Sequence, residues 1–185
     1  MVTKRSGMVV VFTLMAGAAL AASVEPERKD FQVFKAVASS VERYTQFTIF
    51  DDISANVKDG VVTLSGRVTM PYKRDDIEKR VAKISGVVAV HDDITVLPVS
   101  LFDDELRYRI ARSIYGHSNF WSYAIMPNPP IHIVVEHGRV TLTGVVGSEV
   151  DRMLARSLAT QFGAFSVTSS LKTDAEVRDA LDKSE

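Results

Sequence analysis

The chain has 185 residues, of which 46% are apolar and 24% are charged, a balance typical of a folded protein with a packed core. It contains no cysteine, which excludes disulfides, thiol chemistry and the cysteine-linked lipid of bacterial lipoproteins. The formal net charge is −1, and loss of Lys4 and Arg5 with a leader would leave it near −3. This charge predicts no general attraction to nucleic acid or to anionic membranes.

The first segment, 1–21, has the features of a secretory signal peptide. Lys4 and Arg5 precede an apolar run from Met8 to Leu20, which ends in small residues around Ala21. The run is shorter than the roughly 20 apolar residues that span a bilayer comfortably. We therefore expect cleavage near Ala21 and a soluble periplasmic protein that is not a lipoprotein. The alternative is an N-terminal membrane anchor that stays uncleaved.

The rest of the chain contains one unit twice. The heptapeptide Gly-Val-Val-Thr-Leu-Ser-Gly at 60–66 returns 78 positions later as Gly-Arg-Val-Thr-Leu-Thr-Gly at 138–144. Apolar residues alternate on both sides of the first glycine of each copy, which predicts a β-hairpin with that glycine in the turn. The last glycine of each motif, Gly66 or Gly144, is in phase with the apolar face, so we expect a helix to approach the sheet there.

A helix is expected on each side of each hairpin, because apolar residues recur there at three- and four-residue spacing. The first helices begin near Asp30 and Asp103, and the second run over Tyr72–Ser85 and Ser148–Phe162. Third strands follow over 87–96 and 165–171, parallel to the preceding strand because the crossover is right-handed. The residues that we expect to face the sheet are Val33, Phe34, Val37, Val41, Tyr44, Ile77, Val81, Ile84, Leu106, Ile110, Ile114, Val150, Leu154 and Leu158.

This order of elements, with its Gly-x-Val-Thr-Leu-x-Gly-x-Val hairpin, resembles the BON domain (bacterial OsmY and nodulation). The resemblance implies fold class α+β, with two tandem αββαβ domains at 29–98 and 100–173 and a C-terminal tail at 174–185. Each domain would be a three-stranded mixed sheet with two helices on one face. The matching glycines are Gly60, Gly66, Gly86, Gly138, Gly144 and Gly163, with Gly86 and Gly163 ending the second helices.

The resemblance further implies a non-enzymatic protein of the cell envelope that acts under stress by contact with phospholipid or envelope proteins. Within the chain, the segment Gly116–Pro130 holds five additional residues relative to the first copy and clusters three aromatic residues. On a loop they can dock on a lipid interface or a partner, and the alternative is that they cover the domain core or the seam between the copies. The second helix of the second copy carries two arginines beside a methionine, which can meet lipid phosphates while apolar groups touch acyl chains. The candidate contact residues are Phe120, Trp121, Tyr123, Arg152, Met153 and Arg156.

No catalytic motif is present, so we expect no enzymatic activity, no metal and no cofactor. The histidines lack the spacing of metal ligands, and paired acidic residues at element boundaries are interpreted as caps and turns rather than as general acids or bases. The histidines are His91, His117, His132 and His137, and the acidic pairs are Asp51-Asp52, Asp92-Asp93 and Asp103-Asp104. A periplasmic chaperone or interaction module is the alternative function. It would use open sheet faces that expose Val61, Thr63, Val134, Thr141 and Val145.

Overall fold

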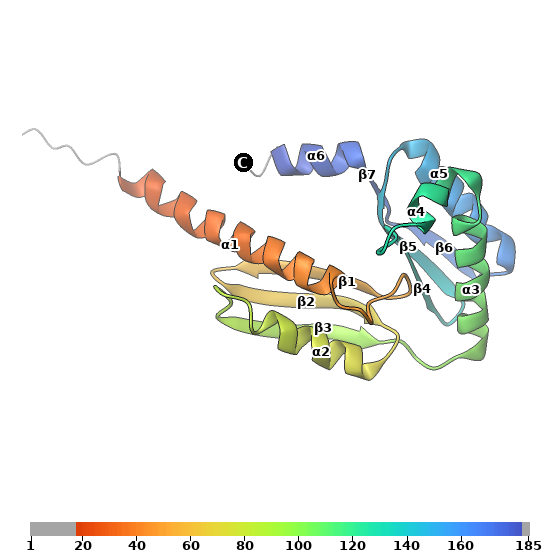
Figure 1. Cartoon of the computed structure of the whole chain (residues 1–185), viewed down its shortest axis with the longest axis horizontal. Helices are drawn as coiled ribbons and strands as arrows, with labels where there is room; N and C mark the ends of the chain where they lie inside the picture. The colour runs from red at the N-terminus through yellow and green to blue at the C-terminus, as the bar shows by residue number, and fades with distance from the viewer. Residues whose placement is uncertain (1–17, 183–185) are drawn as a thin grey trace, which may run out of the picture.

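The computed structural model describes residues 18–182, and the side chains of residues 29–180. Residues 1–17, which contain most of the predicted signal peptide, lie outside the described residues. The chain forms two α+β domains that follow one another along the sequence and lie side by side (Figure 1). The predicted fold class is confirmed.

The first domain has the predicted αββαβ order, and the central strand of its sheet pairs antiparallel with the first strand and parallel with the third. The two helices cover one face of the sheet (Figure 1). The core between them contains the predicted residues of both helices, except that Phe34 is exposed rather than buried. The elements are α1 (Ala18–Glu42), β1 (Asp52–Lys58), β2 (Val61–Val68), α2 (Pro71–Val81) and β3 (Ala89–Val96).

The second domain repeats this plan with additions: two short helical turns before its hairpin, an interrupted last strand and a C-terminal helix. The predicted tail therefore begins as a helix. It is capped by Thr173, whose hydroxyl accepts from the Glu176 N–H while Glu176 accepts from the Thr173 N–H. The elements are α3 (Leu101–Tyr115), η1 (Ser118–Phe120), α4 (Trp121–Ala124), β4 (Ile131–Glu136), β5 (Arg139–Val146), α5 (Glu149–Ala159), η2 (Thr160–Phe162), β6 (Ser166–Ser169), β7 (Lys172–Thr173) and α6 (Asp174–Asp182).

The buried face of α5 differs from the prediction. Val150 is exposed, Leu154 and Leu158 are half-buried, and the fully buried positions are Ala155 and Ala159. Small side chains on this face let the helix pack close to the sheet. The larger leucines consequently lie along the margin of the contact, and Val150 in the first turn projects past it.

Gly66 and Gly144 lie against the backbone of a neighbouring strand. The prediction that a helix approaches the sheet at these glycines is therefore wrong. A Cβ on Gly66 would lie 2.1 Å from the carbonyl oxygen of Asp52, and one on Gly144 would lie 1.8 Å from that of Pro130. Both glycines have positive φ, at 127° and 111°. The backbone that approaches each glycine therefore belongs to the entry of the antiparallel neighbour, β1 or β4.

Each hairpin turn is held by an aspartate of the domain's first helix, Asp30 in the middle of α1 and Asp103 in the first turn of α3. The carboxylate of Asp30 accepts hydrogen bonds from the N–H groups of Asp59 (2.7 Å) and Gly60 (2.9 Å). Asp103, which is fully buried, accepts from His137 (2.9 Å) and Gly138 (2.7 Å) in the same way. By sequence either Ser100 or Asp103 can cap this helix, and the capping side chain is that of Ser100, whose hydroxyl accepts from the N–H of Asp103.

The two domains meet along β4, the edge strand of the second sheet. The N–H of Ile133 donates to the carbonyl oxygen of Ile49 (2.7 Å), and Nδ1 of His132 donates to that of Asp51 (2.6 Å). The segment between α1 and β1 thus occupies a strand edge that would otherwise be open to pairing with another chain. Farther along β4, Glu136 forms an ion pair with Arg67 of β2 (3.1 Å).

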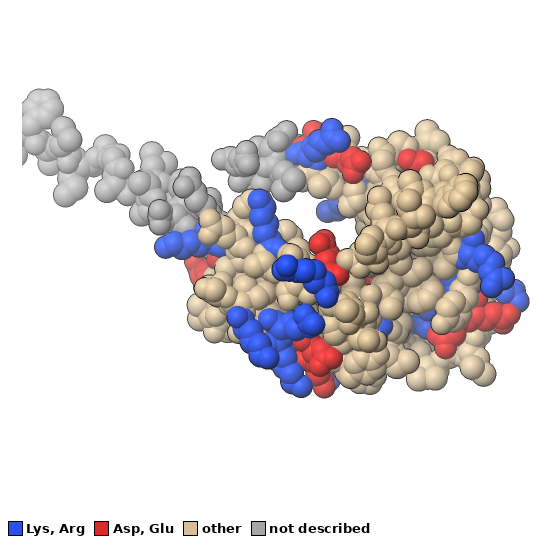
Figure 2. All heavy atoms as spheres, viewed as in Figure 1, with Lys and Arg blue, Asp and Glu red and all other residues tan. Residues whose placement is uncertain are grey.

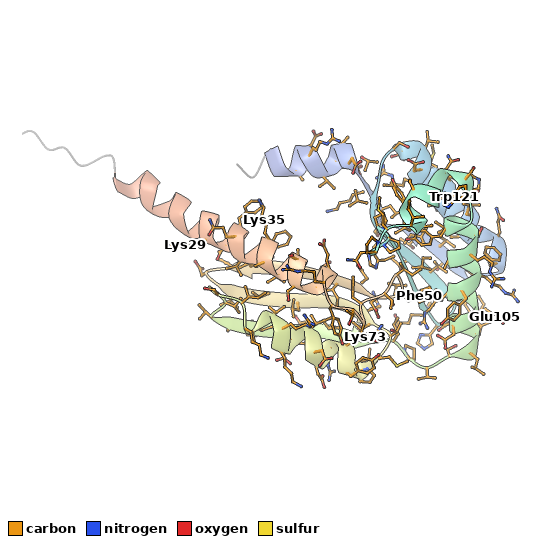
Figure 3. All side chains as sticks on the ribbon, in the orientation of Figure 1. Lys29, Lys35, Phe50, Lys73, Glu105 and Trp121 are labelled. Atoms are coloured by element: carbon orange, nitrogen blue, oxygen red, sulfur yellow. The ribbon has the colours of Figure 1, made fainter. Side chains whose placement is uncertain are left out.

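This contact closes part of the sheet face that was expected to be open. Val134 lies between His132 and Glu136 on the same face of β4 and is buried, so the prediction that Val134 is exposed is wrong. The other four residues predicted on the open faces are half-buried. Phe50 extends the contact by packing on the core of the second domain, with its ring edge toward Tyr108 at 5.3 Å between centroids (Figure 3). The domains therefore share apolar surface.

Candidate contact surface

The aromatic segment begins where α3 stops. α3 ends at Tyr115, and His117 then caps the short turn η1, its Nδ1 accepting from the N–H of Asn119 (3.3 Å). This turn directs the ring of Phe120 into the core of the second domain, where it is fully buried. Phe120 was a predicted contact residue, but its ring has no surface to offer a ligand in this structure.

Tyr123 fixes the middle of the segment. Its ring packs on the same core, with its centroid 6.0 Å from that of Phe120, and its hydroxyl accepts a hydrogen bond from the N–H of Gly147 (2.9 Å). Gly147 directly follows β5 and precedes Ser148, the N-cap of α5. Tyr123 therefore serves as an anchor between α4 and the hairpin that precedes α5.

The far end of the segment is held by two side chains of the second domain, one of which bonds to the backbone of the first domain. The hydroxyl of Tyr115 donates to the carbonyl oxygen of Ile131 (2.5 Å) and accepts from its N–H (3.1 Å), and burial raises the pKa of this phenol. Asn128 donates to the carbonyl oxygen of Glu42 at the end of α1 (2.7 Å). With both ends and the middle bonded, the segment is a defined structural element.

Trp121 and Ile125 lie on the outside of this element and are 71% and 76% exposed, and Met126 beside them is also exposed. We call these three residues the α4 surface. The sequence from 113 to 135 contains no Asp, Glu, Lys or Arg. Figure 2 accordingly shows an uncharged area over α4 and the adjoining chain, and Figure 3 shows Trp121 at its position on the second domain. The structure thus presents an indole and two aliphatic chains on a neutral surface.

The other three predicted contact residues, Arg152, Met153 and Arg156, lie on α5. Arg152 forms ion pairs with Glu149 and with Glu176 of α6 (2.9 Å), and hydrogen bonds to these two carboxylates raise the pKa of its guanidinium. Its donors are therefore engaged within the protein. Met153 and Arg156 are exposed on the outer side of α5.

In the first domain, a buried ion pair joins α2 to the segment just before β1. Nζ of Lys73 lies 2.6 Å from Oδ2 of Asp51, and both side chains are almost completely inaccessible (Figure 3). Asp51 also accepts hydrogen bonds from the backbone and hydroxyl groups of Thr48 and Thr69. Burial alone would raise the pKa of Asp51, but these hydrogen bonds, that from Lys73 first, hold it below its usual range. Asp51 is a structural group that ties three segments together rather than a turn cap.

Among the described residues, no three His, Asp or Glu side chains come close enough together to hold a metal ion. No helix within residues 18–182 combines the length and the apolar character that crossing a membrane requires.

Comparison with known proteins identifies both repeats. The profile of the BON domain family matches residues 30–98 and 121–175. The solved C-terminal domain of CdsD, the structural protein of the Type III secretion system of Chlamydia trachomatis, is 18% identical. That similarity covers 78% of this chain and 68% of the other, with a TM-score of 0.33. A second CdsD structure is 13% identical over 80% of this chain and 97% of its own, with a TM-score of 0.27. No curated protein matches the sequence.

Proposed function

Because the chain belongs to the BON domain family, with one domain in each half, we propose that it is an exported, non-enzymatic protein of the cell envelope that binds phospholipid membranes. The contact is transient and runs through the α4 surface, and its role is protection of the envelope under osmotic or related stress. The observation that carries the proposal is the exposed group of Trp121, Ile125 and Met126 on a segment that is anchored at three points.

The chemistry of the α4 surface favours the interfacial region of a bilayer. An indole has an apolar body and one N–H donor, a combination that is enriched where acyl chains meet headgroups. The rigid support means that little conformational entropy is lost when these side chains insert. Since the segment carries no charge, its contact should depend weakly on headgroup charge and on salt. Binding to an envelope protein is the other outcome that the experiment must distinguish.

The test is co-sedimentation of the chain from Ala22 onward with zwitterionic or anionic vesicles, read together with the fluorescence of Trp121, the only tryptophan. We expect a blue shift with both vesicle types. The variant Ile125→Ser with Met126→Ser keeps the fluorophore and should lose most of the bound fraction. Tyr72→Ser, an exposed aromatic residue on α2, is the matched control and should bind as the wild type does. Equal sedimentation of the α4 variant and the wild type would reject the α4 surface as the contact.

A further inference from the structure

The two domains place the same backbone contact beside their hairpin turns but surround it with different side chains. The N–H of Val88 donates to the carbonyl oxygen of Gly60 (2.8 Å), and the N–H of Phe165 donates to that of Gly138 (2.8 Å). Val88 and Phe165 are therefore equivalent positions. The turn-holding Asp30 and Asp103 are likewise equivalent, so Lys29 of the first domain corresponds to Phe102 of the second.

In the second domain this position forms an exposed aromatic projection. The rings of Phe102 and Phe165 lie over the turn at Gly138, 6.4 Å apart between centroids, and are 52% and 80% exposed. Leu101, the first residue of α3, is exposed beside them. We call Leu101, Phe102, Phe165 and the neighbouring Arg139 the hairpin tip. Large apolar side chains gathered at one exposed position mark an interaction site more often than isolated ones do.

In the first domain the equivalent position is an open groove. It has a volume of about 480 Å³ and lies between the middle of α1, the hairpin turn and the chain that leads into β3. We call it the α1 groove. Its apolar wall includes Val33 and Val88, and the two glycines beside them, Gly60 and Gly86, add no side chain. Where the second domain has two aromatic rings, the first domain thus has space bounded by apolar groups.

The charges at the two positions are complementary. Arg139 at the hairpin tip is exposed, and no described residue forms an ion pair with its side chain. The nearby Asp103 is occupied by the turn amides, and Asp104 is paired with Arg107. The α1 groove is lined by Lys29, Asp30 and Asp59, and the carboxylate of Asp30 is occupied by the turn amides. The side chain of Asp59 is exposed at the edge of the groove and forms no ion pair with another described residue. Arg139 beside the aromatic rings and Asp59 beside the groove are therefore the two charges of opposite sign that a contact can bring together.

We propose that the hairpin tip of one copy of this chain docks into the α1 groove of a second copy, with Arg139 facing Asp59. Within one molecule the β1–β2 turn and the start of α3 lie at opposite ends (Figure 1), so the contact joins different copies. Two different patches meet, which makes the contact heterologous and head-to-tail. It uses none of the residues of the α4 surface and is independent of the membrane proposal.

The test is sedimentation velocity of the chain from Ala22 onward at protein concentrations up to about 1 mM, a range that detects association with a Kd as weak as about 1 mM. The wild type should show association that grows with concentration. Phe102→Ser with Phe165→Ser removes the tip, and Val88→Trp fills the groove, so each variant alone should remain monomeric. Mixed together, the two variants should form a dimer and nothing larger, because one retains only a groove and the other only a tip. Tyr72→Ser is the control for loss of an exposed aromatic residue.

The charge pair is tested by Arg139→Gln and Asp59→Asn. Asparagine is chosen because residue 59 has positive φ, which asparagine tolerates. Each change should weaken association roughly fivefold, as for an exposed ion pair, and the double variant should be no weaker than either single one. A wild type that stays monomeric throughout the range, or tip and groove variants that associate as it does, would overturn the proposal.

Discussion

The two domains use different side chains to accept a hydrogen bond from the same backbone N–H, the one that follows the second strand of the hairpin. In the first domain the N–H of Thr69 donates to the carboxylate of Asp51 (2.8 Å), which is paired with Lys73. In the second, the N–H of Gly147, 78 positions later, donates to the hydroxyl of Tyr123 (2.9 Å). A buried ion pair and an aromatic anchor thus close the same gap between the first helix and the hairpin. The aromatic solution removes charge from this region, and the neutral α4 surface follows from it.

The largest effect is expected when the cation of the first domain's buried ion pair is removed. Lys73→Met leaves the buried carboxylate of Asp51 without its cationic partner, and we expect a loss of about 3–5 kcal/mol in the free energy of unfolding. Urea unfolding followed by circular dichroism measures it. Arg74→Met is the neighbouring control, since the Arg74 side chain is half exposed and its ion pairs with Asp75 and Asp92 are each worth under about 1 kcal/mol. Equal losses in the two variants would show that Asp51 does not depend on Lys73.

The pair of Asp51 and Lys73 also predicts that the stability of the first domain depends on pH in the acid range. The pKa of Asp51 is lowered in the folded state, so its contribution is complete above its unfolded pKa, near 3.9. That contribution is lost as the pH falls through the lower folded value. Stability should therefore decline below about pH 4 in the wild type and decline less steeply in Asp51→Asn. Urea midpoints across this pH range provide the measurement, and parallel curves for both proteins would contradict the prediction.

In the second domain, the adjacent residues Phe120 and Trp121 should differ in how much they contribute to stability. Phe120→Ala empties a fully buried position and should lower the free energy of unfolding by about 3–5 kcal/mol. Trp121→Ala changes an exposed residue and should stay within about 0.5 kcal/mol of the wild type. Thermal unfolding of both variants tests the contrast. A large loss from Trp121→Ala would mean that the indole packs on the protein.

A smaller effect is expected from the hydroxyl of Tyr123. Tyr123→Phe retains the ring but removes the acceptor for the N–H of Gly147, and we expect a loss of about 1 kcal/mol because water can reach this exposed glycine. Hydrogen exchange at Gly147 should accelerate in the variant. Unchanged exchange would show that the hydroxyl does not protect this amide.

The smallest effect concerns the seam between the domains. Arg67→Gln removes the half-exposed ion pair with Glu136 and should cost under about 1 kcal/mol, decreasing further in high salt. Differential scanning calorimetry at two salt concentrations checks this prediction. The contacts of Ile49 and Phe50 with the second domain remain in the variant, so the two domains should still unfold with the same cooperativity.

Much of each domain could be predicted from local patterns. Alternation around Gly60 and Gly138 indicated hairpins, and each turn has two successive residues with positive φ, as a two-residue turn requires. The aromatic segment was recognised as unusual, but neither its shape nor the outward position of Trp121 was predictable. Adjacent residues on a helical turn point in different directions, and which one enters the core depends on anchors such as Tyr123 that are distant in the sequence.

The duplication, the αββαβ order and most of the core can be predicted from local sequence, because they depend on periodicity and on glycine at sharp turns. Three features cannot be predicted in this way: Val134 is covered, Phe120 is buried beside an exposed Trp121, and Asp51 pairs with Lys73. Each of these outcomes depends on a contact between segments that are far apart along the chain. Such contacts are selected by shape and by the need to satisfy buried polar groups, and neither is encoded in a local pattern.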